Sequence, residues 1–160
     1  MEGALLLDYA HQPDVIYWLL QKKPESVYLA AGTAGDMEFS SNPNFLAMTL
    51  EYESLMISTI HLNYLQIPER HEYEIVGDEG WAILDANTGL LRIGDKKTNK
   101  EFVQHIKLER DQMYRDEHQA FFDAIDGKRE PETSPADGLI SMMIIEAAMQ
   151  SWKMKKRIKI

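Results

Sequence analysis

The stretch GALLLDYAHQPDVIYWLL, residues 3–20, decides how the rest of the chain can be arranged. Three ionisable residues, Asp8, His11 and Asp14, recur in it at three-residue spacing within an otherwise apolar run. If the segment is helical, residues three apart lie on one face, so these three form a polar stripe beside side chains that pack on a core. The Asp8 carboxylate can then orient the His11 imidazole as a proton shuttle.

The same stretch also fits a capped core helix with no catalytic role. Asp8 is a good N-cap, and a partly buried His11 is often structural. Pro13 cannot donate a backbone hydrogen bond. The helix therefore begins near Asp8 and kinks, or begins at Gln12 with Pro13 in its first turn. Spacing alone leaves both interpretations open.

Composition bounds the class of protein. The 160 residues, 44% of them hydrophobic, predict about one globular domain with a real core. No apolar run approaches the roughly 20 residues that span a bilayer, so no membrane partner is expected. The net charge of −9 argues against nucleic-acid binding. The absence of cysteine excludes thiolate metal sites and fits a cytoplasmic location, and the five histidines form no close pair that predicts a metal site.

Hydrophobic periodicity and turn residues predict an α+β fold. After the first helix and a long loop at 32–44, alternation at 46–52 and 56–64 indicates a hairpin. We expect a large, mostly antiparallel sheet with helices packed on one face and the other face available for oligomerisation. Leu46, Met48 and Leu50 are expected on one face, with Ile57 and Ile60 pointing oppositely. The further expected elements are strands at 25–31, 70–76, 81–85, 89–93, 101–107 and 156–160, and helices at 111–126 and from Ser134 to about residue 153.

Four motifs follow one another along the chain. They are Gly3, Asp8, His11, Asp14 and Trp18-Leu19; Leu62 to Arg70 followed by Glu74-Ile-Val-Gly77-Asp-Glu-Gly80; Tyr114, His118, Phe121 and Ile125; and Ser134-Pro-Ala-Asp137-Gly-Leu with Ser151. Their order and spacing resemble the C-terminal domain of the glucose-fructose oxidoreductase / inositol dehydrogenase / MocA (Gfo/Idh/MocA) family. The resemblance covers essentially the entire chain.

This resemblance implies a two-domain enzyme of which residues 1–160 are the C-terminal substrate-binding and oligomerisation domain. The N-terminal Rossmann domain would hold NAD or NADP, and the sequence here has no Gly-x-Gly-x-x-Gly after a strand and no Glu-Lys-Pro. Met1 and Glu2 therefore look like the start of a truncated chain. We expect no cofactor bound to this chain and no activity from it alone. The full-length enzyme is expected to oxidise or reduce a sugar, polyol or sugar derivative and to form a homodimer or larger assembly through the sheet face.

The resemblance also implies roles for individual residues. His11 would be the general acid/base that takes a proton from the substrate hydroxyl, and Asp8 would orient it; Asp14 is expected to be structural. Many family members with this histidine motif carry Ser and Glu beside the histidine, where this chain has Ala10 and Gln12.

Four further residues are candidates for substrate binding. Tyr114 and His118 share a helix face and can reach one pocket, although both also suit the apolar face of a core helix. Gln66 and Arg70 lie where a strand meets a turn, and an arginine there can bind a substrate carboxylate or phosphate. A surface arginine paired with an acid is the other interpretation of Arg70.

Two functions remain open from the sequence. The first is the substrate-binding half of an NAD(P)-dependent oxidoreductase. The alternative is a non-catalytic oligomerisation or interaction module of the same fold. A Rossmann fingerprint immediately upstream would decide for the enzyme.

Overall fold

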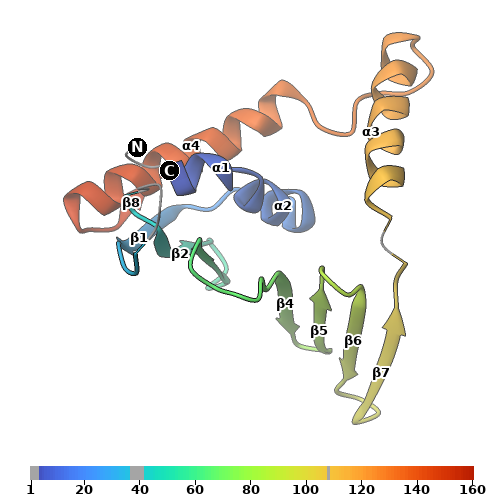
Figure 1. The fold of residues 1–160 in the computed structure, drawn as a ribbon, viewed down its shortest axis with the longest axis horizontal. Helices are drawn as coiled ribbons and strands as arrows, with labels where there is room; N and C mark the ends of the chain where they lie inside the picture. The colour runs from blue at the N-terminus through green and yellow to red at the C-terminus, as the bar shows by residue number, and fades with distance from the viewer. Residues whose placement is uncertain (1–3, 37–41, 108) are drawn as a thin grey trace. The chain divides into compact units, whose positions relative to one another are not determined.

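The computed structural model describes residues 4–36, 42–107 and 109–160. The chain divides into two compact units: unit 1 comprises Met1–Leu65 and Glu132–Ile160, and unit 2 comprises Gln66–Pro131. Each unit has a four-stranded antiparallel sheet of its own, and Figure 1 shows both with their helices. The predicted α+β class and the antiparallel pairing are confirmed. Among the described residues the strands pair as two four-stranded sheets, where we expected one large sheet.

Unit 1 is built around the strand order β3-β2-β1-β8. Its predicted hairpin is confirmed, with β2 and β3 in register from Phe45 opposite Asn63 to Glu51 opposite Ile57. The terminal strand pairs with β1 at Ser26 and Val27. The elements are α1 (Ala4–Asp8), α2 (His11–Leu20), β1 (Ser26–Gly32), β2 (Phe45–Glu51), β3 (Ile57–Asn63), α4 (Pro135–Met154) and β8 (Ile158–Lys159).

The opening stretch forms two helices. α1 ends at Asp8 and α2 begins at His11, with the backbone N–H of Gln12 donating to Tyr9 O at 3.0 Å across the turn. Pro13 is the third residue of α2, where a missing N–H costs little because first-turn amides have no intrahelical partner. The prediction that Asp8, His11 and Asp14 form a stripe on one helix is therefore wrong, because Asp8 and His11 lie on different helices.

The core of unit 1 lies between its sheet and α4. Ser134 caps α4: its hydroxyl accepts from the Asp137 N–H, and the Asp137 side chain accepts from the Ser134 N–H in return. Leu5 and Leu6 of α1 are fully buried in the same core. The other buried apolar residues are Val27, Leu29, Leu46, Met48, Leu50, Tyr52, Ile60, Ile144, Ile145, Ala147 and Ala148.

One expectation about the sheet faces was wrong. Ile60 lies directly opposite Met48, so both side chains point to the face that the helices cover. Ile57 lies opposite Glu51 on the other face and is exposed. Residues three apart on a strand point to opposite faces, so the two isoleucines cannot share one.

Unit 2 is an antiparallel meander in the order β4-β5-β6-β7, followed by a helix. Its strands confirm the four predicted between residues 70 and 107. Its helix ends as predicted next to Gly127, which takes φ 70°. The elements are β4 (Glu72–Gly77), β5 (Gly80–Asp85), β6 (Leu90–Asp95), β7 (Lys100–His105) and α3 (Arg110–Ile125).

Part of the predicted loop at 32–44, residues 37–41, lies outside the described residues. Within the residues that are described, no helix is long and apolar enough to cross a membrane.

Candidate functional site

Asp8 and His11 are placed by the turn between the first two helices. Asp8 is the last residue of α1 and His11 the first of α2, and both side chains are exposed. The buried side chains of Leu5 and Leu6 hold α1 against the core, so the turn that follows is attached to a fixed element. Asp8 and His11 therefore lie at the two ends of one short turn at the surface of unit 1.

The Asp8 carboxylate is hydrogen-bonded to Tyr64, which was not among the predicted site residues. The hydroxyl of Tyr64 donates to Asp8 Oδ2. The ring of Tyr9 lies between this pair and the histidine, with centroids 6.0 Å from Tyr64 and 5.6 Å from His11. We call Asp8, Tyr9, His11 and Tyr64 the Asp8–Tyr64 cluster. In the sequence, Tyr64 reads as the last apolar position of an alternating strand, and nothing local marks it as a partner of residue 8.

Tyr64 stays a hydrogen-bond donor in this cluster. Burial, the hydrogen bond to Asp8 and the negative charge of Asp8 raise the pKa of Tyr64 above its usual value. The phenol is therefore protonated at neutral pH and can donate to the carboxylate throughout the neutral range.

Asp14 has the structural role that the sequence suggested for it. It lies in the first turn of α2, and its Oδ1 accepts a hydrogen bond of 2.7 Å from the hydroxyl of Ser141, which is 6% exposed on α4. Tyr17 of α2 also meets the first turn of α4, where burial and then the Asp137 carboxylate raise the pKa of Tyr17. These contacts join the helix that begins with His11 to α4.

The other four predicted site residues belong to unit 2. Arg70 is ion-paired with Glu72, and the hydrogen bond to Glu72 raises the pKa of Arg70. Gln66 is exposed just before β4. Tyr114 and His118 lie one turn apart on α3, and both are exposed. The structure thus groups Asp8 and His11 in unit 1 and these four residues in unit 2.

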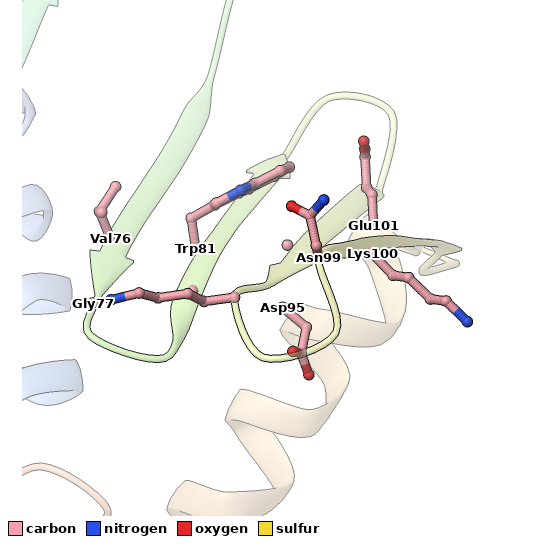
Figure 2. A pocket seen from close by; sticks show the side chains of 10 residues that line it. Val76, Gly77, Trp81, Asp95, Asn99, Lys100 and Glu101 are labelled. Carbon is pink, nitrogen blue, oxygen red and sulfur yellow. The ribbon is translucent and has the colours of Figure 1, made fainter.

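A hollow of about 400 Å³ lies at one end of the unit 2 sheet, and Figure 2 shows side chains that line it. None of the six predicted site residues lines it. The Trp81 indole lies flat on Gly94, where an added Cβ would come within 2.1 Å of Nε1. Arg92 stacks on the same ring at 5.5 Å and is ion-paired with Glu101. These contacts give Trp81 a packing role on the sheet.

The described residues do not supply a metal or dinucleotide site. No group of three His, Asp or Glu side chains among them is arranged to hold a metal ion. A dinucleotide pyrophosphate is held by a glycine-rich turn between a strand and the start of a helix. In the described ranges α3 follows β7 across residues 106–109, which include no glycine, and α4 begins at Ser134-Pro135. The described residues therefore form no such dinucleotide site.

Comparison with solved structures shows which fold this is. An aldose-aldose oxidoreductase from Caulobacter crescentus, complexed with glycerol, aligns with a TM-score of 0.81 at 18% identity over 98% of this chain and 47% of its own. Levoglucosan dehydrogenase, in complex with NADH and levoglucosan, aligns with a TM-score of 0.78 at 14% identity, over 95% of this chain and 48% of its own. The WlbA dehydrogenase from Bordetella pertussis, in complex with NADH and UDP-GlcNAcA, aligns with a TM-score of 0.69 at 21% identity, over 96% of this chain and 43% of its own. The chain spans about half the length of these structures.

No curated protein matches the sequence. Residues 2–160 match the family described as "Oxidoreductase family, C-terminal alpha/beta domain", and this match confirms the resemblance drawn from the four motifs. The chain belongs to the Gfo/Idh/MocA oxidoreductase family, as its C-terminal domain.

Proposed function

We propose that this chain is the substrate-binding and oligomerisation half of an NAD(P)-dependent oxidoreductase acting on a sugar, polyol or sugar derivative. The observation that carries the proposal is an exposed histidine, His11, at the first position of α2 in a domain of an oxidoreductase family. The dinucleotide would be bound by sequence outside these 160 residues. The substrate class is supported by the aldose, levoglucosan and nucleotide-sugar names of the similar structures. The cysteine-free sequence supports a cytoplasmic enzyme, and its net charge of −9 supports one that does not bind nucleic acid.

In this proposal the chain supplies the proton acceptor. The nicotinamide, when bound, supplies hydride chemistry, which belongs to the cofactor. The hydroxyl of the substrate must lose its proton as the carbon is oxidised, and the His11 imidazole takes that proton and returns it in the reverse direction. The Asp8 carboxylate accepts from Tyr64, so in this proposal Asp8 orients the imidazole through the turn that joins the two residues.

We keep Gln66, Arg70, Tyr114 and His118 as proposed substrate-binding residues. All four side chains are exposed in unit 2. Arg70 already pairs with Glu72, so binding of an anionic substrate group by Arg70 would have to compete with that pair.

The test uses the full-length enzyme with glucose, levoglucosan and UDP-GlcNAcA, each with NAD⁺ and NADP⁺, followed by the absorbance of the reduced nicotinamide. We expect turnover of at least one sugar. His11→Ala should lower its kcat by about 10²- to 10⁴-fold while the Kd of the cofactor stays unchanged. His61→Ala is the matched control, because His61 is exposed on β3 and faces away from the core. Near-normal turnover by His11→Ala, or an effect only on thermal stability, would refute the proposal. The alternative function, a non-catalytic oligomerisation or interaction module, would then be favoured.

The 160-residue chain alone should neither bind NADH nor oxidise a sugar. Fluorescence titration of the chain with NADH checks this. Saturable binding in the micromolar range would show that the dinucleotide site lies in this chain after all.

We also propose that the enzyme self-associates through the unit 2 sheet. Ile75, Ala82, Ile93 and Phe102 lie side by side across all four strands on one face. Ile75 and Phe102 at the two edges are 46% and 56% exposed, and a second copy of the chain would cover this apolar row.

Sedimentation at micromolar concentration tests this interface. The unchanged protein should sediment as a dimer or larger, and Phe102→Glu should release monomers. Val103→Glu is a matched control, since Val103 is the next residue on β7, is equally exposed and points to the opposite face. If Phe102→Glu left the assembly intact, the interface would lie elsewhere.

A further inference from the structure

Tyr64 lies far from Asp8 in sequence and meets it only because the chain folds. The two residues are 56 positions apart, one following β3 and the other ending α1, and the phenol hydroxyl donates to Asp8 Oδ2. No local turn or capping motif forces this pairing. It therefore links the turn that leads into His11 to the sheet.

The Tyr64 backbone is itself anchored. Its N–H donates to the carbonyl of Asn44 at 3.0 Å. Asn44 is 2% exposed, and its side-chain amide is bonded to both the N–H and the carbonyl of Ala34, at 3.0 and 2.7 Å. A side chain carried by such a backbone position has a fixed starting point from which to reach Asp8.

The segment that Tyr64 restrains is short. After Asp8 the chain makes one turn through Tyr9 and Ala10, and the next residue is His11. The Tyr9 ring in this turn lies next to the rings of both Tyr64 and His11, so one turn residue packs against the anchored phenol and the imidazole. An oriented imidazole needs its backbone held to within a fraction of an ångström, because a misplaced acid/base loses rate steeply.

We propose that Tyr64 is a positioning residue of the active site, whose hydroxyl holds the Asp8 carboxylate and thereby fixes the turn that presents His11. The inference rests on the proposed function of His11. Tyr64 acts through Asp8 and does not itself take a proton in the reaction. The phenol keeps its proton across the neutral range, so it can donate to the Asp8 carboxylate throughout that range.

A thermodynamic cycle that needs no substrate tests the contact. Tyr64→Phe and Asp8→Ala are made singly and together in the 160-residue chain, and the free energy of unfolding is measured in urea. The two losses should be less than additive, because each substitution removes the partner of the other. Tyr28→Phe, at an exposed tyrosine of β1, should be additive with Asp8→Ala. Additive losses from Tyr64→Phe and Asp8→Ala would overturn the proposal.

A kinetic cycle in the full-length enzyme tests the role, with the sugar from the panel above that is turned over. Tyr64→Phe keeps the ring, and we expect it to lower kcat about tenfold, less than His11→Ala, with little change in KM. In an Asp8→Ala background the same substitution should have no further effect on kcat, because the residue through which it acts is gone.

The outcomes separate this inference from the proposed function. If His11→Ala is inactive but Tyr64→Phe matches the unchanged enzyme, the positioning role fails alone. If Tyr64→Phe lowered kcat equally in the unchanged and Asp8→Ala backgrounds, Tyr64 would act by packing. That result would also overturn the positioning role. If His11→Ala is fully active, the proposed function fails, and the unfolding cycle still decides whether the contact exists.

Discussion

Removing the Ser141 hydroxyl tests how the helix that begins with His11 is held in place. Ser141 is 6% exposed on α4 and donates to Asp14 Oδ1 at 2.7 Å. A hydrogen bond to a charged group contributes about 1.5–3 kcal/mol. Asp14 is only half-buried, so water partly replaces the lost donor and the lower end of that range applies. Ser141→Ala should therefore lower the free energy of unfolding of unit 1 by about 1.5 kcal/mol.

Urea unfolding followed by tryptophan fluorescence measures this change. Trp18 and Trp152 lie in unit 1 and Trp81 in unit 2, so a Trp81→Phe background makes the signal report unit 1. Ser58→Ala is the control, because the Ser58 hydroxyl makes only a 3.4 Å contact with Tyr52, and its removal should cost less than about 0.5 kcal/mol.

A double-mutant cycle isolates the pair. Asp14→Ala and Ser141→Ala should couple by about 1 kcal/mol or more, because each removes the partner of the other. Additive losses would refute the reasoning, since they would show that the two side chains do not interact in solution. A fall in stability equal to that of Ser58→Ala would refute the assigned magnitude as well.

Three further changes concern α4. Ser151→Ala should cost about 2–3 kcal/mol in urea unfolding, because the fully buried Ser151 hydroxyl accepts from the Leu29 N–H at 3.0 Å, and that amide would be left without a partner. Gly138→Ala should raise the free energy of unfolding by about 0.5–1 kcal/mol, since Gly138 is helical and exposed with no atom within 4 Å of an added Cβ. The backbone and side-chain hydrogen bonds of Ser134 lower the pKa of Asp137, so its contribution is present above the usual carboxyl pKa of 3.8 and is lost as the pH falls through the lower folded value. The acid limb of a stability–pH curve should flatten in Asp137→Asn.

Local signals in the sequence predicted most elements of this fold. The Ser134-Pro135 start with Asp137 three residues after the cap satisfies two otherwise free amides, so the start of α4 depends on neighbouring residues alone. Strand alternation likewise located β2 and β3, because burial of Met48 and Leu50 requires a period of two.

The division of the strands into two sheets depends on which strands pair with each other, and a short segment of sequence does not contain that information. Alternation states which residues share a face and not which strands are neighbours. The same limit applies to the site. Asp8 and His11 were found because they are close in sequence, whereas Tyr64 and Ser141 were missed as partners of the same stretch because their contacts span 56 and 127 residues.

These partners also bear on the choice between a catalytic histidine and a capped core helix. Each carboxylate of the opening stretch has its own described partner: Asp8 accepts from Tyr64, and Asp14 accepts from Ser141. His11 lies between them, exposed, and within the described part of the chain it has a ring contact with Tyr9 and no hydrogen bond to either ring nitrogen. A structural histidine is ordinarily buried with its nitrogens satisfied. The exposed ring nitrogens of His11 leave room for a bound hydroxyl, as its proposed role of proton acceptor requires.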